Sequence, residues 1–356
     1  MSIKKIAEMT GVSYSTVSRV LNNPDYKCST NELRDKIWKA AMELNYAPNE
    51  AARRLKAGDE KDKTYFINVL MTRMDAAQSD PFFSELLRVV ESEIHKQSCI
   101  LSKVWYKSIF SDDRRCKREN IDAVINRMYD ETQGHSDGLI VIGKCNKEAL
   151  IKLEKKFKNI VCANRDASSG EVDEVICNGN KIASTAVEYL IELGHESIGY
   201  VGKCHNEARY QGYVQTLEKH GLDVDLDYVT ETKQTEAEGY ETMKKIMKSD
   251  KWPTGIYCSN DITAIGMRKY LNKCKSRYYM PSIISSDGIE EGEFTTPMLT
   301  TVQIPKNDMG RFALYLLLDR LKGNHKSKVT MELDCRLIKR NSCTLADESK
   351  WCDYYI

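Results

Sequence analysis

The first 22 residues carry apolar side chains at the spacing of two short helices. Residues three or four positions apart lie on the same face of a helix. This spacing occurs on both sides of Gly11, at Ile3, Ile6 and Ala7 before it and at Val17, Val20 and Leu21 after it. Glycine tolerates the backbone conformation of a sharp turn. The pattern therefore predicts two helices that pack together across a turn at Gly11.

The second of these helices directs polar groups away from its apolar stripe. The outward residues are Tyr14, Ser15, Ser18, Arg19 and Asn22. Hydroxyl and amide groups can reach phosphates or base edges in a DNA major groove, and an arginine can bond a guanine through two hydrogen bonds. The pattern fits a DNA-reading helix-turn-helix and, equally well, an ordinary amphipathic hairpin.

A third helix and a short helical segment follow. The apolar face of the third helix consists of Leu33, Ile37, Ala41 and Leu44. Pro48 ends this three-helix unit, and residues 50–57 form a segment that stops at Gly58. An isolated helix needs about 12–15 residues to hold in water. Taken alone, the composition of residues 50–57 therefore favours a solvated linker.

From Tyr65 onward, short apolar runs alternate with helical patterns. The strand candidates are residues 66–71, 139–142, 159–163, 197–202, 255–259 and 282–286. The helical stretches are residues 83–97, 147–157, 180–193, 207–220, 236–248 and 262–273. Such alternation is typical of a doubly wound parallel α/β sheet. The number of units is too large for one sheet with short loops, so two sheets are expected.

Charge and cysteine content narrow the class of protein. The net charge of the 356 residues is only +1, so a basic surface has to be local. Residues 1–24 and 49–57 each hold three cations and one carboxylate. The twelve cysteines form no C-x-x-C pair, which argues against a zinc ribbon or a disulfide framework and favours reduced thiols in a cytoplasm. We expect no export signal and no membrane span.

Enzyme motifs are absent or broken. Residues 138–144 match G-x-x-x-x-G-K, but their interior is an apolar strand, and Cys145 replaces the Ser or Thr that would bind magnesium. The six histidines show no metal-ligand spacing, and His195 has the position of a helix cap. We therefore expect no catalytic residues, no metal and no cofactor.

Several runs together resemble the LacI/GalR family of bacterial transcription regulators. They are GVSYSTVSRVLN at 11–22, Tyr46, Pro48, Asn49, Ala52, Arg53, Leu55, DPFFSELL at 80–87, DGLIVIG at 137–143, EYLIELGHESIGYVG at 188–202, ARYQGY at 208–213, EGYETM at 238–243, SNDITAIG at 259–266 and LTTVQIP at 299–305. A C-terminal strand, VTMELDCRLIKRNS at 329–342, follows them. The matches run in order through nearly the whole chain, up to residue 342.

The resemblance implies an α/β protein in which a small all-α helix-turn-helix domain precedes two Rossmann-like, doubly wound parallel-sheet subdomains of the periplasmic-binding-protein-like type. The implied parts are a DNA-binding domain at 1–47, a hinge helix and linker at 48–62, a two-lobed effector-binding and dimerisation core at 63–342 with crossovers near 177, 301 and 326, and a tail at 343–356. Nothing in the resemblance assigns a role to the tail.

The resemblance also implies the DNA contacts. By position they are Tyr14, Ser15, Thr16, Arg19 and Asn22 in the recognition helix, and Ala52, Leu55 and Lys56 in the hinge. Leu55 would act as a wedge in the minor groove, between cations that contact the adjacent phosphates. Paired half-sites in a pseudo-palindromic operator imply a homodimer.

Effector contacts follow in the same way. Ligands of open α/β sheets bind beyond the carboxyl ends of the strands. By family position the polar contacts are Arg165, Arg209, Asn260, Asp261 and Asp287, and the apolar wall is Phe82 and Phe83. Two departures from the family pattern stand near them: Ser285-Ser286-Asp287 replaces Gly-Phe-Asp in a stretch about three residues shorter, and Gln234 replaces a stacking aromatic.

These features predict a bacterial, cytoplasmic and nucleoid-associated repressor. Its operator affinity would be controlled by a small carbohydrate, with a β-galactoside as the first choice. The alternatives are a regulator that responds to a purine or a phosphoprotein co-effector, and a cytoplasmic sugar-binding module without DNA function.

Overall fold

A computed structural model describes residues 3–22, 30–44, 64–73, 80–111, 113–164, 172–274 and 279–347. The chain divides into two units, Met1–Tyr65 and Phe66–Ile356. The hinge positions Ala52, Leu55 and Lys56, and the effector candidate Arg165, lie outside the described residues.

Within residues 3–22 and 30–44, the first unit forms a three-helix bundle. Its helices are α1 (Ile3–Thr10), α2 (Tyr14–Asn22) and α3 (Asn31–Glu43). Gly11 has a φ of +72°, so the turn between α1 and α2 uses the left-handed conformation that glycine adopts without strain. The buried core consists of Ile6, Val17, Val20, Leu21, Ile37, Ala40 and Ala41. The helical apolar spacing of this segment therefore predicts its packing correctly.

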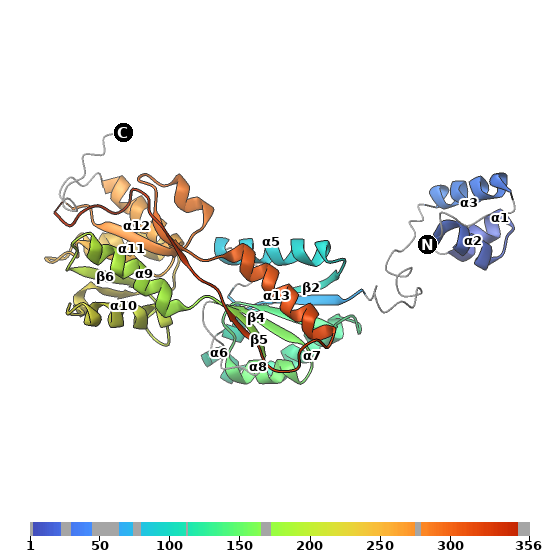
Figure 1. Cartoon of the computed structure of the whole chain (residues 1–356), viewed down its shortest axis with the longest axis horizontal. Coiled ribbons are helices and arrows are strands. Elements are labelled where there is room, and N and C mark those ends of the chain that lie inside the picture. Colours follow the sequence, from blue (N-terminus) through green and yellow to red (C-terminus); the bar gives the residue numbers. More distant parts are fainter. Residues whose placement is uncertain are drawn as a thin grey trace. The chain divides into compact units, whose positions relative to one another are not determined.

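The second unit contains two lobes, each built on a six-stranded sheet (Figure 1). The first lobe has the strand order β11-β5-β4-β3-β1-β2, and all its strand pairs are parallel. Its strands are β1 (Phe66–Met71), β2 (Ile100–Tyr106), β3 (Gly138–Ile142), β4 (Ile160–Asn164), β5 (Asp173–Ile176) and β11 (Thr330–Glu332). Its helices are α5 (Pro81–Lys96), α6 (Asp113–Arg118), α7 (Ile121–Glu131), α8 (Lys147–Glu154) and α13 (Lys306–Leu321).

The second lobe has the order β12-β10-β9-β8-β6-β7, in which only β12 runs antiparallel to its neighbour. Its strands are β6 (Ile198–Gly202), β7 (Val229–Glu231), β8 (Gly255–Cys258), β9 (Ser282–Asp287), β10 (Thr300–Gln303) and β12 (Arg336–Ile338). Its helices are α9 (Gly179–Glu192), α10 (Ala208–Lys219), α11 (Glu236–Ile246) and α12 (Asp261–Cys274). Helices α9 and α10 cover one face, and α11 and α12 cover the other (Figure 1).

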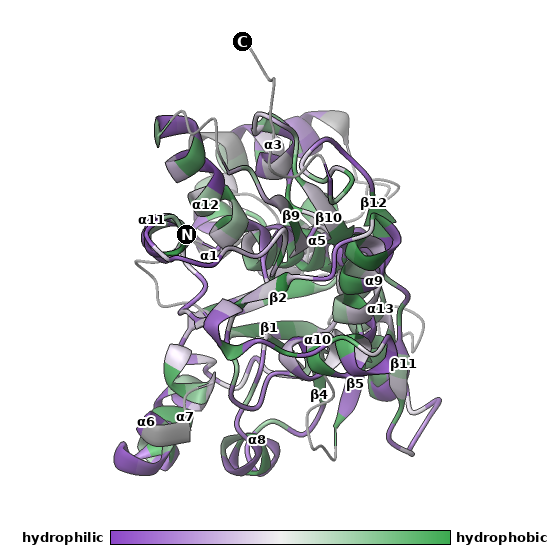
Figure 2. Ribbon diagram, turned by 90° about the vertical axis from the view of Figure 1, so that its left-hand side faces the viewer, coloured by the Kyte–Doolittle hydropathy of each residue, from purple (hydrophilic) through white to green (hydrophobic). Residues whose placement is uncertain are grey.

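Burial explains why the central strands read as unbroken apolar runs. Leu139, Ile140, Val141 and Ile142 of β3 are all fully buried, because helices cover both faces of a parallel sheet. Figure 2 shows apolar residues concentrated on the strands of the first lobe and polar residues along α6 and α8. The cores of both lobes therefore lie between sheet and helices.

The chain crosses between the lobes three times, at residues 177–178, 304–305 and 333–335. The expected crossover near 326 was misplaced, because residues 330–332 still pair with β5 in the first lobe. The expected single strand at 329–342 was also wrong. Its two apolar stretches join different sheets as β11 and β12.

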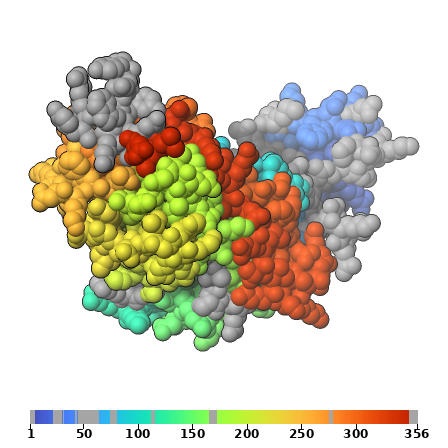
Figure 3. All heavy atoms as spheres, turned by 60° about the vertical axis from the view of Figure 1, so that its left-hand side comes forward, coloured from blue at the N-terminus to red at the C-terminus, as the bar shows by residue number. Residues whose placement is uncertain are grey.

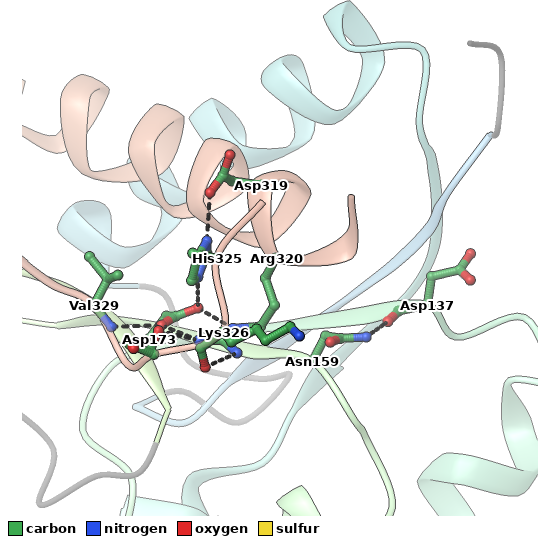
Figure 4. Close-up of polar contacts among 9 residues, drawn as sticks. Asp137, Asn159, Asp173, Asp319, Arg320, His325, Lys326 and Val329 are labelled. Atoms are coloured by element: carbon green, nitrogen blue, oxygen red, sulfur yellow. Dashed lines mark hydrogen bonds and ion pairs between the residues drawn. The ribbon is translucent and has the colours of Figure 1, made fainter. Parts of the chain in front are cut away.

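A cluster of charged residues fixes the end of α13 to the edge of the first sheet (Figure 4). The carboxylate of Asp173 is fully buried and accepts hydrogen bonds from Arg320, from His325 Nε2 at 2.9 Å and from the amide of Val329 at 2.9 Å. His325 Nδ1 lies 2.5 Å from the carboxylate of Asp319. The imidazole is thus held between two carboxylates.

The segment after β12 packs on the second lobe. The carbonyl of Thr344 lies 3.0 Å from His195 Nε2, and the amide of Ala346 donates to the carbonyl of Leu193 at 2.9 Å. His195 is buried, and its Nδ1 lies 3.0 Å from the hydroxyl of Thr254. Figure 3 shows this segment in red beside the yellow-green surface of α9. The described start of the tail is therefore part of the lobe.

Candidate DNA-reading surface and effector site

The N-terminal end of α2 is organised by Ser13. Its hydroxyl accepts a hydrogen bond from the amide of Thr16 at 3.2 Å and lies within 2.9 Å of the hydroxyls of Ser15 and Thr16. A serine in this position satisfies an amide that the first helical turn would leave without a partner. These bonds hold Ser15 and Thr16, two of the predicted DNA contacts, at the start of the helix.

The two sides of α2 differ as its spacing predicts. Val17, Val20 and Leu21 are buried in the bundle, whereas Tyr14 is 50% exposed and Ser15 and Arg19 are exposed. Thr16 is half-buried. Asn22 ends the helix, but its side chain lies outside the described residues. An aromatic ring, a hydroxyl and a guanidinium thus stand together on the outer side of the helix.

Arg209 is held at the N-terminal turn of α10 in the second lobe. Its side chain is buried, and its Nε donates to the carboxylate of Glu207 at 2.7 Å. Its Nη1 donates to the carbonyl of Ser259. Burial opposes the charge of Arg209, but the adjacent Glu207 raises the pKa of the guanidinium, so it remains protonated. The fixed cation lies at the carboxyl end of β8.

Asn260 and Gln234 form a second polar pair beside it. Asn260 Nδ2 donates to the carbonyl of Gln234 at 3.1 Å, and Gln234 Nε2 donates to the hydroxyl of Ser259 at 2.7 Å. Gln234 has a φ of +66°, which only a few non-glycine residues adopt. Asn260 Oδ1 is buried and has no hydrogen-bond partner within the described part of the chain. Such an acceptor is suited to a hydroxyl donor from a ligand.

Asp261 occupies a different kind of position. Its fully buried carboxylate accepts hydrogen bonds from the hydroxyls of Ser285 and Thr301, at 2.5 and 2.6 Å, and from the amide of Ile289 at 2.8 Å. Burial raises the pKa of Asp261, and these hydrogen bonds act in the opposite direction. All the described contacts lie within the second lobe, where they join the start of α12 to β9 and β10.

The serines that replace the family's Gly-Phe pair have partners inside the lobe. Ser285 donates to Asp261, and Ser286 lies 2.8 Å from the hydroxyl of Tyr257 and donates to the carbonyl of Ser259 at 3.2 Å. Asp287 follows them at the end of β9, buried and with a φ of +131°. The polar strand therefore supports the backbone of the site.

The first lobe meets this group through two cations. Arg73 Nη2 donates to Gln234 Oε1 at 2.9 Å, and Lys144 Nζ donates to the carbonyl of Asn206 at 3.2 Å. Phe83 is buried, and both it and Arg73 pack against Gly143. A Cβ atom built on Gly143 would lie 2.7 Å from Arg73 Cγ and 3.4 Å from Phe83 Cε1. Phe82 is also buried and packs edge to face on Phe83, with 5.1 Å between ring centroids.

Lys203 completes a cluster of positive charges. Burial is the main cause that lowers the pKa of Lys203 to about 8; the nearby charges of Arg73, Lys144 and Arg209 act in the same direction, and Glu207 acts against them. Lys203 thus lies within the influence of three other positive charges. Reasoning from the sequence missed Arg73, Lys144 and Lys203. The available signal was that each follows the carboxyl end of a buried strand by one or two residues.

Lys306 ties the lobes together behind the cluster. Its Nζ lies 2.8 Å from the carboxylate of Glu85 on α5 and donates to the carbonyl of Gly288 at 2.6 Å. Glu85 belongs to the first lobe and Gly288 follows β9 in the second. The side chain is largely buried, so its charge depends on partners from both lobes.

The described residues contain no group of three or more side chains that could hold a metal ion. Among the helices of the described ranges, none is long and apolar enough to cross a bilayer.

Comparisons with known proteins agree with this architecture. Residues 2–49 match the model of bacterial regulatory proteins of the lacI family, and residues 187–343 match a periplasmic binding protein-like domain. The chain is 31% identical to the HTH-type transcriptional repressor CytR of Escherichia coli K12, over 96% of each chain.

Two solved structures are also similar. One is a LacI family regulator from Enterococcus faecium with bound ribose, 25% identical with a TM-score of 0.64, covering 79% of this chain and 99% of that one. The other is the Lac repressor dimer bound to operator and the anti-inducer ONPF, 21% identical with a TM-score of 0.76, covering 97% and 99%. The chain therefore belongs to the LacI family of bacterial transcription regulators, as a DNA-binding repressor with a ligand-binding core and not as an enzyme.

Proposed function

We propose that the protein works as a homodimer in the bacterial cytoplasm, at the nucleoid, and reads a pseudo-palindromic operator. Tyr14, Ser15, Thr16, Arg19 and Asn22 would contact bases and phosphates of one half-site. The hinge residues Ala52, Leu55 and Lys56 would enter the minor groove. The exposed polar side of α2 supports the first assignment. One helix-turn-helix buries little surface, so two copies are needed for specific binding.

The effector would bind between the lobes, where the polar groups of the second lobe meet Arg73 and Lys144. Arg209, Asn260 and Asp287 would hold its hydroxyls, with Arg165 as a further contact and Phe82 and Phe83 as the apolar side. Asp261 would position the backbone beneath them. The observation that carries this proposal is the buried acceptor of Asn260, which has no protein donor in the described residues. The ribose bound to the Enterococcus regulator supports a carbohydrate.

The charges favour a carbohydrate that carries an anionic group. The positive charges of Arg73, Lys144 and Arg209 all disfavour the protonated form of Lys203, whereas Glu207 favours it. A phosphate or carboxylate between them would form charge-assisted hydrogen bonds and relieve the repulsion. We therefore place sugar phosphates ahead of neutral β-galactosides.

A thermal-shift screen tests this ranking. Neutral sugars are compared with their phosphates, because a ligand that binds only the folded state raises the melting temperature. Lys203→Gln should weaken sugar-phosphate binding about tenfold, a loss of about 1.4 kcal/mol. Lys219→Gln, at an exposed lysine on α10 that pairs with Glu188, is the matched control.

The outcomes separate the proposals. If a neutral sugar stabilises the protein and Lys203→Gln does not change that stabilisation, the effector is a carbohydrate without an anionic group. Stabilisation by a purine alone would replace the carbohydrate.

A further inference from the structure

Two of the three crossovers run side by side. Residues 177–178 connect β5 to α9, and residues 333–335 connect β11 to β12. The amide of Leu333 donates to the carbonyl of Ile176 at 2.8 Å, so the two segments are in register where they leave the first lobe. Each carries one cysteine, Cys177 and Cys335.

The two thiols are in contact. The side chain of Cys177 is a hydrogen-bond partner of the Cys335 sulfur, and this contact lowers the pKa of Cys335. The Cys335 sulfur also lies 3.9 Å from the hydroxyl of Thr185 on α9. Next to it, Lys181 Nζ forms an ion pair of 2.5 Å with Asp334. Hydrogen-bond donors and a cation thus surround one of the two sulfurs.

Exposure and charge distinguish the partners. Cys177 is 1% exposed, whereas Cys335 is half-buried and within reach of small solutes. The hydrogen bond from Cys177 is the largest cause that lowers the pKa of Cys335 to about 7, against burial, with help from Thr185 and Lys181. By contrast, burial raises the pKa of Cys343 to about 12. Cys335 is therefore substantially a thiolate near neutral pH.

We propose that Cys177 and Cys335 form an oxidisable dithiol that a hydroperoxide converts into a disulfide. The Cys335 thiolate attacks the peroxide O–O bond and becomes a sulfenic acid, while the departing oxygen takes a proton and leaves as water or an alcohol. The Cys177 sulfur then attacks the sulfenic sulfur, and its proton leaves with the hydroxyl as water. The peroxide gains the two electrons that the two thiols lose.

The disulfide would fasten two crossovers to each other. Relative motion of the lobes requires the crossover residues to change their backbone angles. A covalent link between them would restrict that motion and so reduce the effect of the effector on operator binding. This consequence rests on the proposed function, whereas the dithiol itself does not.

The dithiol is tested in the full chain with hydrogen peroxide as the probe, followed by alkylation, intact mass measurement and peptide mapping. We expect a mass lower by two hydrogen atoms, the loss of two alkylatable thiols and a linked peptide pair containing Cys177 and Cys335. Cys177→Ser should leave a sulfenic acid on Cys335 that dimedone traps, and Cys335→Ser should abolish both products. Cys274→Ser, at an exposed cysteine of α12, should behave as the parent.

Other results would overturn the proposal. The proposal is rejected if Cys335 can still be alkylated after the peroxide has oxidised Cys274. It is also rejected if the disulfide forms between other cysteines. Circular dichroism of each variant checks that the fold is retained.

Operator titrations with the oxidised and dithiothreitol-reduced protein then test the consequence. A linked protein with an unchanged ligand response would reject the coupling and keep the dithiol. Failure to link would reject the dithiol and leave the proposed function standing.

Discussion

Ser13 shows how single side chains prepare the surface of α2. By bonding Ser15, Thr16 and the Thr16 amide, it fixes the first turn on which the predicted base contacts stand. Arg19 lies one to two turns further along the same exposed side. Their arrangement depends on a helix whose opposite side is buried in a small core.

Arg19→Ala should relax sequence preference, since a bidentate contact to one base contributes roughly 1–3 kcal/mol of discrimination. The measurement is selection from random duplexes, followed by titration of the selected operator and its single-base variants. Arg118→Ala, at an exposed arginine of α6, serves as the control. A selected sequence that is identical for parent and variant would exclude base reading by Arg19.

Among single residues, the sequence analysis named candidates that stand in family motifs. It did not name residues whose only signal is that they follow the carboxyl end of a strand. Arg209 and Asn260 could be named as candidates because they stand in runs that resemble the family. Arg73 and Lys144 follow strands of the first sheet and Lys203 follows a strand of the second, so their proximity depends on how the two lobes meet. Likewise, spacing could not show that the carboxylate of Asp261 is surrounded by Ser285, Thr301 and Ile289.

Among the elements, burial decides what could be predicted. Strands covered on both sides, such as β1 and β3, are continuous apolar runs and were found. Strand β2 lies at an edge with Lys103 exposed, and β7 has only three residues. The buried strands β5 and β10 have four residues each, too few for a clear periodic signal, and were also missed. Helix α13 was missed because Leu316, Leu317 and Leu318 are consecutive and blur its stripe.

Helices α11 and α12 approach so closely that two glycines lie at backbone contact. A Cβ on Gly239 would lie 2.0 Å from the carbonyl oxygen of Thr263, and one on Gly266 would lie 2.0 Å from that of Glu236. Gly266→Ala should therefore lower the unfolding free energy by about 3 kcal/mol, at the upper end for overpacking. Denaturant titration measures this change.

Gly292→Ala is the control, because its nearest atom would be at an ordinary 3.6 Å. Equal stability of the Gly266 variant and the parent would show that the helices can separate without loss.

His325 gives the first lobe a dependence on pH. Hydrogen bonds to Asp173 and then Asp319 raise the pKa of His325. Because an unfolded histidine titrates near pH 6.5, its contribution to stability is complete below about pH 6.5 and is lost as pH rises through the folded pKa. The melting temperature of the parent should therefore fall over this pH range, and that of His325→Gln should not show this fall.

The control is His205→Gln, since that side chain is 89% exposed. Buried His195 has the opposite dependence on pH. Burial lowers the pKa of His195, so the fold favours its neutral form, and the stability of the protein falls as the solution becomes acidic. If the melting temperature of the His325 variant falls with rising pH as that of the parent does, another group causes this fall.

For the whole molecule, the contacts between lobes matter most. Arg73, Lys144 and Lys306 each bond a partner in the second lobe. In the proposed homodimer, a ligand that changes these contacts would change the relation between the lobes and, through it, the spacing of the two DNA-binding units. Such coupling has to be reciprocal.

The effector should therefore change operator affinity by the same factor by which operator changes effector affinity, in the usual range of about 5–150-fold. Operator titrations with and without the sugar phosphate that stabilises the protein give one factor. Calorimetric ligand titrations with and without operator give the other, and a scrambled duplex is the control. Unequal factors would contradict a single coupled equilibrium.

The order of crossovers also determines when each lobe can be completed during synthesis. Strands β1 to β5 leave the ribosome first, but their sheet receives α13 only after residue 321 and β11 only after residue 332 has been made. Until α13 has been made, Gly138 has no contact with Leu317, and Val89 has no contact with Gly310. The second lobe has most of its sheet in the continuous stretch 179–303. The lobe that is synthesised first is therefore exposed longest to aggregation and chaperones.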